Sequence, residues 1–421
     1  MFDVMREGLS VDEAQKAVLK MTQRLAAETI STSEAAGRIL AESIESGRRQ
    51  PPQDCSAMDG YAVRRADLLE ASADSPISVP IVFEVAAGAK AKRSLEAGEA
   101  ARIFTGAPLP TGADAIIRQE DTRSDAGRVE ILVAPLAREH VRDAGEDFGI
   151  GDQLIASGTL LGAPHLGALA SVGRSVVSVH QRPTVAILSG GNELVEPDRS
   201  ADPDKIVSSN SYTIAAQCRE AGAMPMYLGI AEDTPTSIEA KLHAGQRADV
   251  IVSSAGVSVG DHDHVRGVLE KMGCRLHFWG VKMKPGFPLV FGVIESTGTL
   301  VFGLPGNPVS ASVTFEEFVR PVLRKMLGHR ALYRPVVRAR LTEKMTKKAG
   351  RLHFVRVILE TRDGEYHATP VENQSSGVLT SLVRGHGLAV FRAECEGLDV
   401  GAEVDVQILD PAFFDQNERG F

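Results

Sequence analysis

The stretch Thr184-Val-Ala-Ile-Leu188, which runs into Ser189-Gly-Gly-Asn-Glu193, begins a regular alternation of strands and helices. Its apolar residues predict a buried strand, and the glycines that follow predict a turn. Similar apolar runs recur at Met224–Ile230, Val250–Ser253 and Leu300–Phe302. Apolar residues at helical spacing predict helices at Tyr212–Ala221, Thr236–Ala244, Val265–Met272 and Ser310–Leu327. Such an alternation is typical of a parallel sheet that helices cover on both faces.

The N-terminal part of the chain carries helix signals instead. Ser10 and Glu13 form a capping-box pattern, in which both side chains accept hydrogen bonds from free N–H groups at a helix start. Ser31, with Glu34 three residues later, predicts the start of a second helix. The pair Pro51-Pro52 then marks a boundary.

Two further segments predict β structure, one on each side of the α/β region. Between about residues 55 and 145, short strands are predicted at Val79–Val85, Ala101–Phe104, Ala115–Arg118 and Val129–Val133. Residues 150–178 return to mixed helix and loop, so this β segment is predicted to be an insertion. After Arg334, strands are predicted at Val336–Leu341, His353–Leu359 and Glu403–Leu409, with Arg362-Asp-Gly364 as a hairpin turn.

Composition narrows the classes of function. The 421 residues are 43% hydrophobic and carry a net charge of −9, which excludes a broad phosphate-backbone footprint and with it nucleic acid as a partner. The four cysteines are far apart in sequence and predict reduced thiols rather than disulfides or a zinc site. No signal peptide is evident after Met1, and the longest charge-free run, Ser296–Phe315, contains several Gly and Pro residues. We therefore expect no membrane association and a cytoplasmic location.

Three loops follow predicted strands and therefore meet at the carboxyl edge of the sheet, where α/β proteins bind ligands. They are Ser189–Glu193, Ser254–Asp263 and Gly303–Pro308. Glycine lets the backbone approach an oxyanion closely, and helix starts present free N–H donors. A single loop of this kind is often only a turn, but three on one edge predict an anion pocket. None matches a Walker A or G-x-G-x-x-G pattern, which disfavours an ordinary ATPase or dehydrogenase.

Charged residues near these loops are candidates for the same pocket. Lys282 and Lys284 precede Pro285-Gly286, and a lysine on such a turn can reach a phosphate, although a solvated loop lysine is the plainer interpretation. Glu193, Asp233 and Asp263 follow strand ends. Asp59 and Asp147 come from outside the α/β region. Acidic side chains around a phosphate pocket are explained if an Mg²⁺ ion bridges them and the phosphate oxygens. Taken one by one, each of these carboxylates is more simply interpreted as a surface residue or a turn cap.

Several motifs together resemble the molybdopterin molybdenumtransferase family, which includes the E domain of gephyrin. The resemblance covers essentially the whole chain. It is carried by Asp54-Cys-Ser-Ala-Met-Asp-Gly-Tyr-Ala62, Ile103-Phe-Thr-Gly-Ala-Pro-Leu-Pro110, Ala113-Asp-Ala115, Gly256-Val-Ser-Val-Gly260 with Asp263, Lys284-Pro-Gly286 and Gly303-Leu-Pro-Gly-Asn-Pro-Val-Ser310.

The resemblance implies an enzymatic activity, a subunit assembly and a domain organisation for this chain. Members of the family insert molybdate into adenylylated molybdopterin, cleave the adenylate and release AMP with the help of Mg²⁺. They are elongated homodimers of four domains, with the site between the α/β domain of one subunit and the inserted β domain of the other. For this chain it implies an N-terminal domain (residues 1–50 with 148–179), an inserted β domain (51–147), an α/β molybdopterin-binding domain (180–329) and a C-terminal β-barrel-like domain (330–421).

The resemblance also assigns roles to residues. The acidic residues assigned to catalysis are Asp59, Asp147, Glu193 and Asp233, of which Glu193 and Asp233 are also the expected metal ligands. The residues expected to bind the pterin nucleotide are Thr105, Gly190, Gly191, Ser254, Gly256, Ser258, Gly260, Asp263, Lys282, Lys284, Pro305, Gly306, Asn307, Pro308 and Ser310.

One departure from the family pattern bears on function. The family loop usually reads Lys-Pro-Gly-Lys-Pro, but this chain has Lys284-Pro-Gly-Phe287-Pro288 and so lacks one positive charge. A neighbouring lysine such as Lys282 can supply the missing positive charge. Alternatively, the change marks a paralogue with another substrate preference or a weakened transferase activity. A non-catalytic, gephyrin-like scaffold, a tungstate-preferring paralogue and an enzyme acting on another nucleotide-phosphate therefore remain alternatives.

Overall fold

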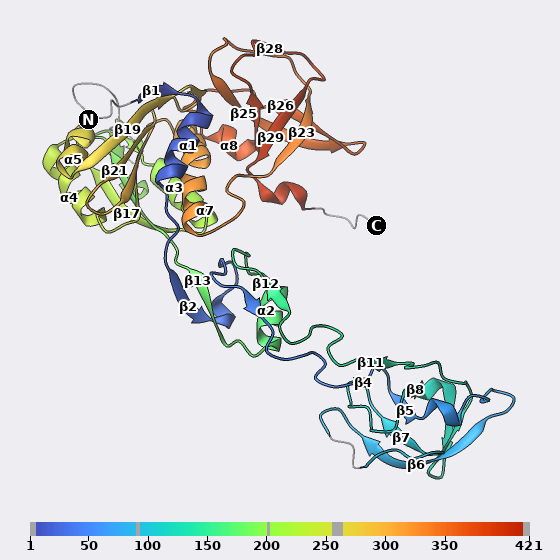
Figure 1. Cartoon of the computed structure of the whole chain (residues 1–421). Helices are drawn as coiled ribbons and strands as arrows, with labels where there is room; N and C mark the ends of the chain where they lie inside the picture. The colour runs from blue at the N-terminus through green and yellow to red at the C-terminus, as the bar shows by residue number, and fades with distance from the viewer. Residues whose placement is uncertain (1–5, 90–92, 200–202, 255–263, 416–421) are drawn as a thin grey trace. The chain divides into compact units, whose positions relative to one another are not determined.

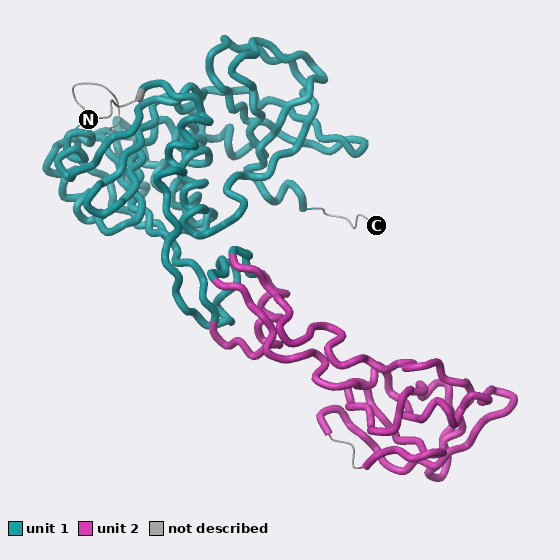
Figure 2. Tube along the Cα trace, in the orientation of Figure 1, with its two compact units in different colours: residues 1–41, 158–161, 177–421 teal, residues 42–157, 162–176 magenta. Residues whose placement is uncertain are grey.

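The computed structural model describes residues 6–89, 93–199, 203–254 and 264–415. Within it the chain forms two compact units (Figure 2). The first comprises Met1–Ala41, Gly158–Leu161 and Val177–Phe421, and the second comprises Glu42–Ser157 and Gly162–Val176. The chain leaves the first unit and returns to it, and the second unit contains the predicted β segment of about residues 55–145 together with residues on both sides of it.

A seven-stranded sheet forms the centre of the first unit (Figure 1). In spatial order its strands are β1 (Arg6–Leu9), β19 (Cys274–Val281), β21 (Val290–Ile294), β22 (Thr299–Leu304), β18 (Val250–Ser254), β14 (Thr184–Gly190) and β17 (Met224–Ala231). The four strands predicted from the sequence are β14, β17, β18 and β22, and they pair in parallel as expected. Strands β1, β19 and β21 were not predicted, and β21 runs antiparallel to both of its neighbours.

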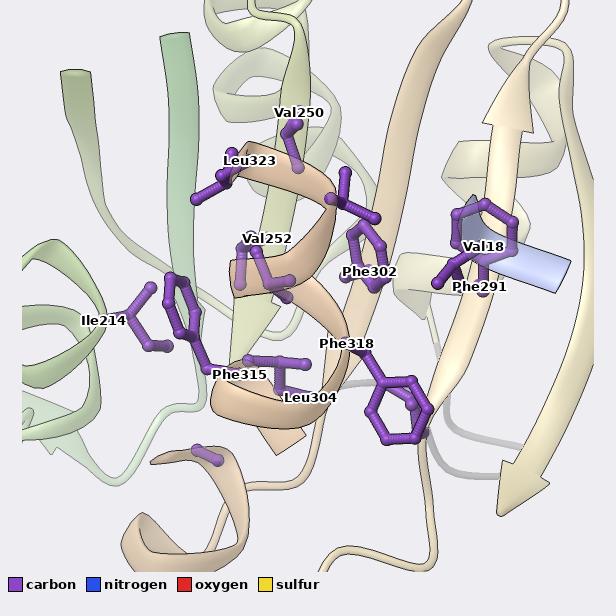
Figure 3. Close-up of a cluster of buried hydrophobic side chains, with 14 of the residues drawn as sticks. Val18, Ile214, Val250, Val252, Phe291, Phe302, Leu304, Phe315, Phe318 and Leu323 are labelled. Carbon is purple, nitrogen blue, oxygen red and sulfur yellow. The ribbon is translucent and has the colours of Figure 1, made fainter. Parts of the chain in front are cut away.

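Helices cover both faces of this sheet. One face packs against α1 (Val11–Met21), α3 (Asn210–Glu220), α6 (Pro308–Thr314) and α7 (Arg320–Met326), and the other against α4 (Pro235–Gly245) and α5 (His264–Lys271). On the first face, Phe291, Phe302, Phe315 and Phe318 pack with aliphatic side chains in a continuous core (Figure 3). Helix α1 carries the predicted capping box, because Ser10 and Glu13 bond each other's backbone N–H groups.

The helix after β22 contains one widened turn. It begins at Pro308, continues through the π-helical segment η5 (Phe315–Val319) and ends at Met326, which agrees with the single long helix predicted there. The turn places Glu316 and Glu317, both buried, on the interior of the unit. Insertions of this type are rare and recur at functional positions.

The C-terminal part of the first unit is a closed five-stranded barrel. Its strands, in order around the barrel, are β25 (Leu352–Arg362), β26 (Glu365–Pro370), β23 (Val336–Leu341), β29 (Glu403–Ile408) and β27 (Gly387–Phe391). The pairing of β27 with β25 closes it. Asp363 and Gly364 both have positive φ between β25 and β26, which confirms the predicted hairpin turn.

Smaller elements complete the first unit. They are β2 (Ala27–Ser31), η1 (Thr32–Glu34), β13 (Val176–His180), β15 (Leu194–Val195), η4 (Pro197–Arg199), β16 (Ile206–Val207), β20 (Met283–Lys284), β24 (Met345–Thr346), α8 (Thr380–Arg384), β28 (Gly397–Leu398) and η6 (Pro411–Phe414). The prediction of a helix at Ser31 was wrong. Ser31 is instead the last residue of strand β2, whose backbone pairs with β13. Only a single 3₁₀ turn follows before Gly37, which has a φ of +74°.

The second unit is mainly β. A six-stranded sheet in the order β8 (Ala115–Arg118), β5 (Gly60–Val63), β7 (Ala100–Ile103), β6 (Ile77–Val85), β10 (Arg128–Ile131) and β9 (Thr122–Asp125) forms its core. The four strands predicted in this segment are all present, with small differences at their ends. The remaining elements are β3 (Ile44–Glu45), β4 (Cys55–Ser56), η2 (Arg65–Asp67), η3 (Gln119–Asp121), β11 (Val141–Arg142), β12 (Gln153–Ile155) and α2 (Ala163–Ser171).

Two expectations drawn from composition can be compared with the structure. All four cysteines are free, and burial raises the pKa of Cys218 and of Cys274 to about 12, which makes neither a ready nucleophile. In the part of the chain that the structure describes, no helix combines the length and the hydropathy that a membrane span requires.

Candidate functional site

A pocket of about 630 Å³ opens where the predicted loops leave the sheet. Of the residues predicted to form the site, it is lined by Glu193, Ser254, Gly306, Asn307 and Pro308. It therefore combines the loops that follow β14 and β22 with the last residue of β18, as the position of these strand ends at one edge of the sheet predicts. The other residues that line it are Leu194, Ile206, Val207, Ser208, Ser209, Asn210, Gly377 and Leu379.

Two reciprocal hydrogen bonds, each from a backbone N–H to a side-chain oxygen, hold the loop after β14. The Asn192 N–H donates to Asp233 Oδ2 at 3.3 Å, and the Asp233 N–H donates to Asn192 Oδ1 at 3.1 Å. Gly191 has a φ of +140°, and a Cβ at that position would collide with the Glu193 carboxylate. Glycine therefore suits position 191, and the exposed carboxylates of Glu193 and Asp233 follow the neighbouring strands β14 and β17.

A cluster of buried serine hydroxyls adjoins the pocket, and Ser208 and Ser254 of this cluster line it. Ser208 Oγ donates to Ser189 Oγ at 3.2 Å and lies 3.1 Å from Ser211 Oγ, while Ser189 Oγ lies 3.4 Å from Ser254 Oγ. All four side chains are nearly inaccessible to solvent. Hydroxyls can rotate to donate or to accept, so this cluster can present donors to an oxyanion near the start of α3.

The loop after β22 is anchored on two sides. Asn210 Nδ2 donates to the Gly306 carbonyl at 2.7 Å, and Asn307 Nδ2 donates to Ser376 Oγ at 3.1 Å. The second bond joins the α/β domain to the segment Asn373–Leu379 of the C-terminal barrel domain. Pro305 and Ser310 are buried beside this loop but do not line the described pocket.

Besides Leu194, Ile206 and Val207, sequence reasoning missed two groups of residues that line the pocket. One is Ser208–Asn210, which precede a predicted helix and could have been recognised as its N-terminal cap. The other is Gly377 and Leu379, which belong to the barrel domain and reach the pocket only through the tertiary fold. No local pattern in the sequence around the latter pair indicates that position.

Of the two predicted lysines, Lys284 lies on the short strand β20 and Lys282 directly precedes that strand. Lys282 and Lys284 are exposed, and β20 pairs with the start of β25. The guanidinium of Arg351 lies 4.7 Å from the centre of the Phe287 ring, and Trp279 contacts the same ring edge-on at 5.4 Å. A positive charge thus lies directly over the residue that replaces the usual second lysine of this loop.

Asp59 and Thr105 contact each other in the second unit. Asp59 Oδ1 accepts hydrogen bonds from the backbone N–H of Thr105 at 2.7 Å and from its hydroxyl at 2.8 Å. These bonds lower the pKa of the Asp59 carboxyl, and the nearby positive charge of Arg102 adds to the effect. The carboxylate is exposed, so its second oxygen is accessible to solvent. Asp147 is also exposed, and its backbone N–H donates to Gln50.

Other predicted residues do not line the described pocket or cannot be placed. Gly190 and Gly191 shape the loop after β14 without lining the pocket. Gly256, Ser258, Gly260 and Asp263 lie outside the described residues. Within the described ranges, no three His, Cys, Asp or Glu side chains gather as a metal cage. Mg²⁺ needs only one or two carboxylates when phosphate and water supply the remaining ligands. Glu193 and Asp233 are the exposed predicted carboxylates that follow β14 and β17, and of the two only Glu193 lines the pocket.

The fold and the pocket define a class of protein. A mainly parallel sheet covered on both faces, with a polar pocket at the carboxyl ends of its parallel strands, is typical of α/β proteins that bind small ligands. Three family models match the chain in sequence. These are the MoeA N-terminal region (domain I and II) over residues 9–173, the probable molybdopterin binding domain over 186–325, and the MoeA C-terminal region (domain IV) over 338–409.

Individual relatives agree with these matches. The molybdopterin molybdenumtransferase of Nostoc sp. is 39% identical over 379 residues, covering 89% of this chain and 87% of that protein. The protein of the same name from Bacillus subtilis is 32% identical and covers 96% and 95%. The crystal structure of the molybdopterin biosynthesis moea protein from Pyrococcus horikosii superposes with a TM-score of 0.83 at 33% identity, covering 95% of this chain and 99% of that one. The chain belongs to the molybdopterin molybdenumtransferase family, as its motifs predicted.

Proposed function

We propose that this protein inserts molybdate into adenylylated molybdopterin, with Mg²⁺-dependent cleavage of the adenylate and release of AMP. The observation that carries the proposal is the pocket at the sheet edge, which combines hydroxyl and backbone donors with an exposed carboxylate. It lies largely in the segment that matches a probable molybdopterin binding domain. The curated relatives are named molybdopterin molybdenumtransferases.

In this proposal the chain's own residues act by positioning and by charge. The buried serine cluster and the loop Gly306–Pro308 bind phosphate and pterin oxygens, and Lys282 and Lys284 add positive charge. Glu193 and Asp233 would hold Mg²⁺, which would neutralise phosphate charge when bound. With Asp59 and Asp147, they form the acidic set that orients the adenylate bond for cleavage.

The proposal also includes a homodimer. Asp59, Thr105 and Asp147 belong to the second unit, whereas all residues that line the pocket belong to the first. We propose that the β domain of a second copy completes each site, in a cytoplasmic enzyme of four domains with the boundaries expected from the sequence. Size-exclusion chromatography with light scattering tests this part of the proposal directly, because a monomer would contradict it.

The activity itself is the first prediction. Purified protein should release AMP from adenylylated molybdopterin when molybdate and Mg²⁺ are present, and chelation of the metal should stop the release. The measurement is AMP by chromatography against a reaction without enzyme. Binding of molybdopterin without AMP release would instead favour the scaffold alternative, and separate titrations of molybdate and tungstate would identify a tungstate-preferring paralogue.

A second prediction concerns the missing lysine. Arg351→Ala should weaken binding of the anionic substrate by about tenfold, the effect of losing one charge-assisted contact. Because Arg351 lies over the ring of Phe287, a lysine at position 287 should restore affinity in the Arg351→Ala background. Substrate affinity by calorimetry measures both changes.

The matched control is Arg340→Ala, since Arg340 is an exposed barrel arginine that pairs with Glu365 at 2.9 Å. Equal affinity losses in the Arg351 and Arg340 variants, or no rescue by lysine at position 287, would show that Arg351 does not supply the missing charge.

A further inference from the structure

A second cavity in the first unit lies between helix α1 and the strands beside it. Its volume is about 460 Å³, and its walls come from α1, from β19 and from single residues of β1 and β21. Among the described residues, none lines both this cavity and the candidate pocket. The volume lies within the range of about 300–1,000 Å³ that is usual for clefts that hold small ligands. We refer to it as the α1–β19 cavity.

The cavity follows from the arrangement of side chains on α1. Val11, Ala14 and Val18 are buried against the sheet and form one face of the helix. The adjacent face carries the α1 residues that line the cavity, which are Glu13, Lys16, Ala17, Lys20 and Met21. Ala17 lies in the middle of this row and has only a methyl group, so the row leaves room between the helix and β19. A larger apolar side chain at this position would occupy that room.

The wall opposite α1 is mainly apolar and contains several rings. It includes Leu276, His277, Phe278 and Phe291, of which the two phenylalanines are buried. The centre of the Phe291 ring lies 5.7 Å from that of Phe278 and 5.7 Å from that of His277. Aromatic rings pair favourably at such separations, so this wall suits a flat apolar molecule.

The rim of the cavity is positively charged. Lys16 and Lys20 lie about one turn apart on α1, Arg275 belongs to β19, and all three are exposed. Among the residues that the structure describes, neither lysine forms an ion pair, whereas Arg275 pairs with the exposed Glu295 at 3.6 Å. Glu13 is the one carboxylate in the described lining, and the capping box already engages it. Because the chain as a whole has a net charge of −9, the positive rim is a local feature.

We propose that the α1–β19 cavity binds a small organic anion, namely a flat apolar ring system that carries a carboxylate, sulfonate or phosphate group. The rings of the ligand lie on the aromatic wall, and its anionic group lies between the two lysines of α1 and Arg275. A protein partner is disfavoured, because a stable protein interface buries about 800 Å² on each side, whereas this site is a concave cavity of ligand size. The site is separate from the candidate pocket, so the inference goes beyond the proposed function and does not depend on it.

A fluorescent anion of this chemistry tests the site in the unmodified, full-length protein. The probe anilinonaphthalene sulfonate combines aromatic rings with a sulfonate, and its emission rises in apolar surroundings. Trp279 is the only tryptophan of the chain and lies two residues after His277 on β19, about 7 Å along the strand. The bound probe should therefore saturate at a single site and quench Trp279 by energy transfer. The neutral analogue phenylnaphthylamine, which lacks the sulfonate, should bind about tenfold more weakly.

Charge reversal at the rim is the decisive variant. Lys20→Glu should weaken binding of the sulfonate probe by about tenfold and leave binding of the neutral analogue unchanged. Arg219→Glu is the matched control, because Arg219 is also an exposed basic residue in the last turn of a helix, here α3, and lines neither the cavity nor the candidate pocket. Equal probe affinity in the two variants would show that the sulfonate does not lie beside Lys20 and would overturn the proposal.

Ala17→Leu tests the cavity itself, since leucine would fill it and is a good helix former. This variant should bind both probes about tenfold more weakly or worse, with an unchanged helical signal in circular dichroism. Ala216→Leu, on the exposed face of α3, is the control and should bind both probes normally. Unchanged binding in Ala17→Leu would exclude the cavity. If Ala17→Leu does not fold, Lys20→Glu still decides, because position 20 is exposed.

Competition identifies the anionic group that the site prefers. Naphthoate and naphthyl phosphate should displace the probe, and the one that does so at the lower concentration shows whether a carboxylate or a phosphate is favoured. Displacement by hexaglutamate, with none by either naphthalene anion, would indicate a peptide site and would overturn the proposal. These measurements involve neither the pterin nor AMP, so their failure is separate from failure of the proposed function.

Discussion

Asp59→Asn should reduce molybdate insertion by about a hundredfold or more, the range expected when a charged group at a reacting centre is lost. The structural reason is that Asp59 Oδ1 is already occupied by two hydrogen bonds from Thr105. An asparagine oxygen can accept those bonds, so the variant loses the charge and the second oxygen but keeps the turn. Its folding should therefore survive, which circular dichroism and thermal melting would show.

Asp67→Asn is a suitable comparison for this experiment. Asp67 lies in the same unit, and its Oδ2 accepts the Gly98 N–H at 2.8 Å, so the substitution makes the same chemical change at another carboxylate that accepts a backbone N–H. This variant should retain full insertion activity. If Asp59→Asn retained activity with an intact melting curve, Asp59 would have no part in the site, and the proposed completion of the site by a second copy would lose its main support.

Much of the fold follows from local patterns. Strands at Ala115–Arg118 and Val336–Leu341 begin and end where the sequence predicts, because alternation and turn residues define both ends. The capping box of Ser10 and Glu13 is likewise a local signal. The helix expected at Ser31 is absent because pairing of β2 with β13 depends on residues almost 150 positions away. Strand β21 was missed for a related reason, since its place depends on neighbours on both sides.

The pocket was predictable in part. Glu193, Ser254 and Gly306 follow strands, and the parallel arrangement of β14, β18 and β22 brings strand ends together without further information. Gly377 reaches the pocket because Arg356 holds its segment and because the barrel packs on the α/β domain. That arrangement depends on barrel closure and strand register, which local sequence patterns do not encode. Arg351 over Phe287 is the same kind of contact, between segments distant in sequence.

The second large effect is expected in the core below the pocket. Phe302→Ala should lower the free energy of unfolding of the first unit by about 3–5 kcal/mol. Phe302 is completely buried on the central strand β22, and its ring centre lies 5.1 Å from that of Phe291 (Figure 3). Removal of the ring leaves a cavity bordered by residues of the sheet and of α6 and α7. Rigid strands on both sides limit how far the core can collapse into that space.

Phe302→Leu shows how much of the loss in the free energy of unfolding comes from the cavity and how much comes from replacing the aromatic ring. Leucine keeps most of the apolar volume, so it should cost less than about 2 kcal/mol. Urea unfolding followed through Trp279 measures both variants in the first unit, because the second unit contains no tryptophan. Equal losses for the two variants would mean that the shape of the aromatic ring, and not the cavity, determines stability. A loss below about 1 kcal/mol for Phe302→Ala would mean that the core adjusts around the missing ring. In that case the buried strand β22 would not be a rigid support for the loop Gly306–Pro308.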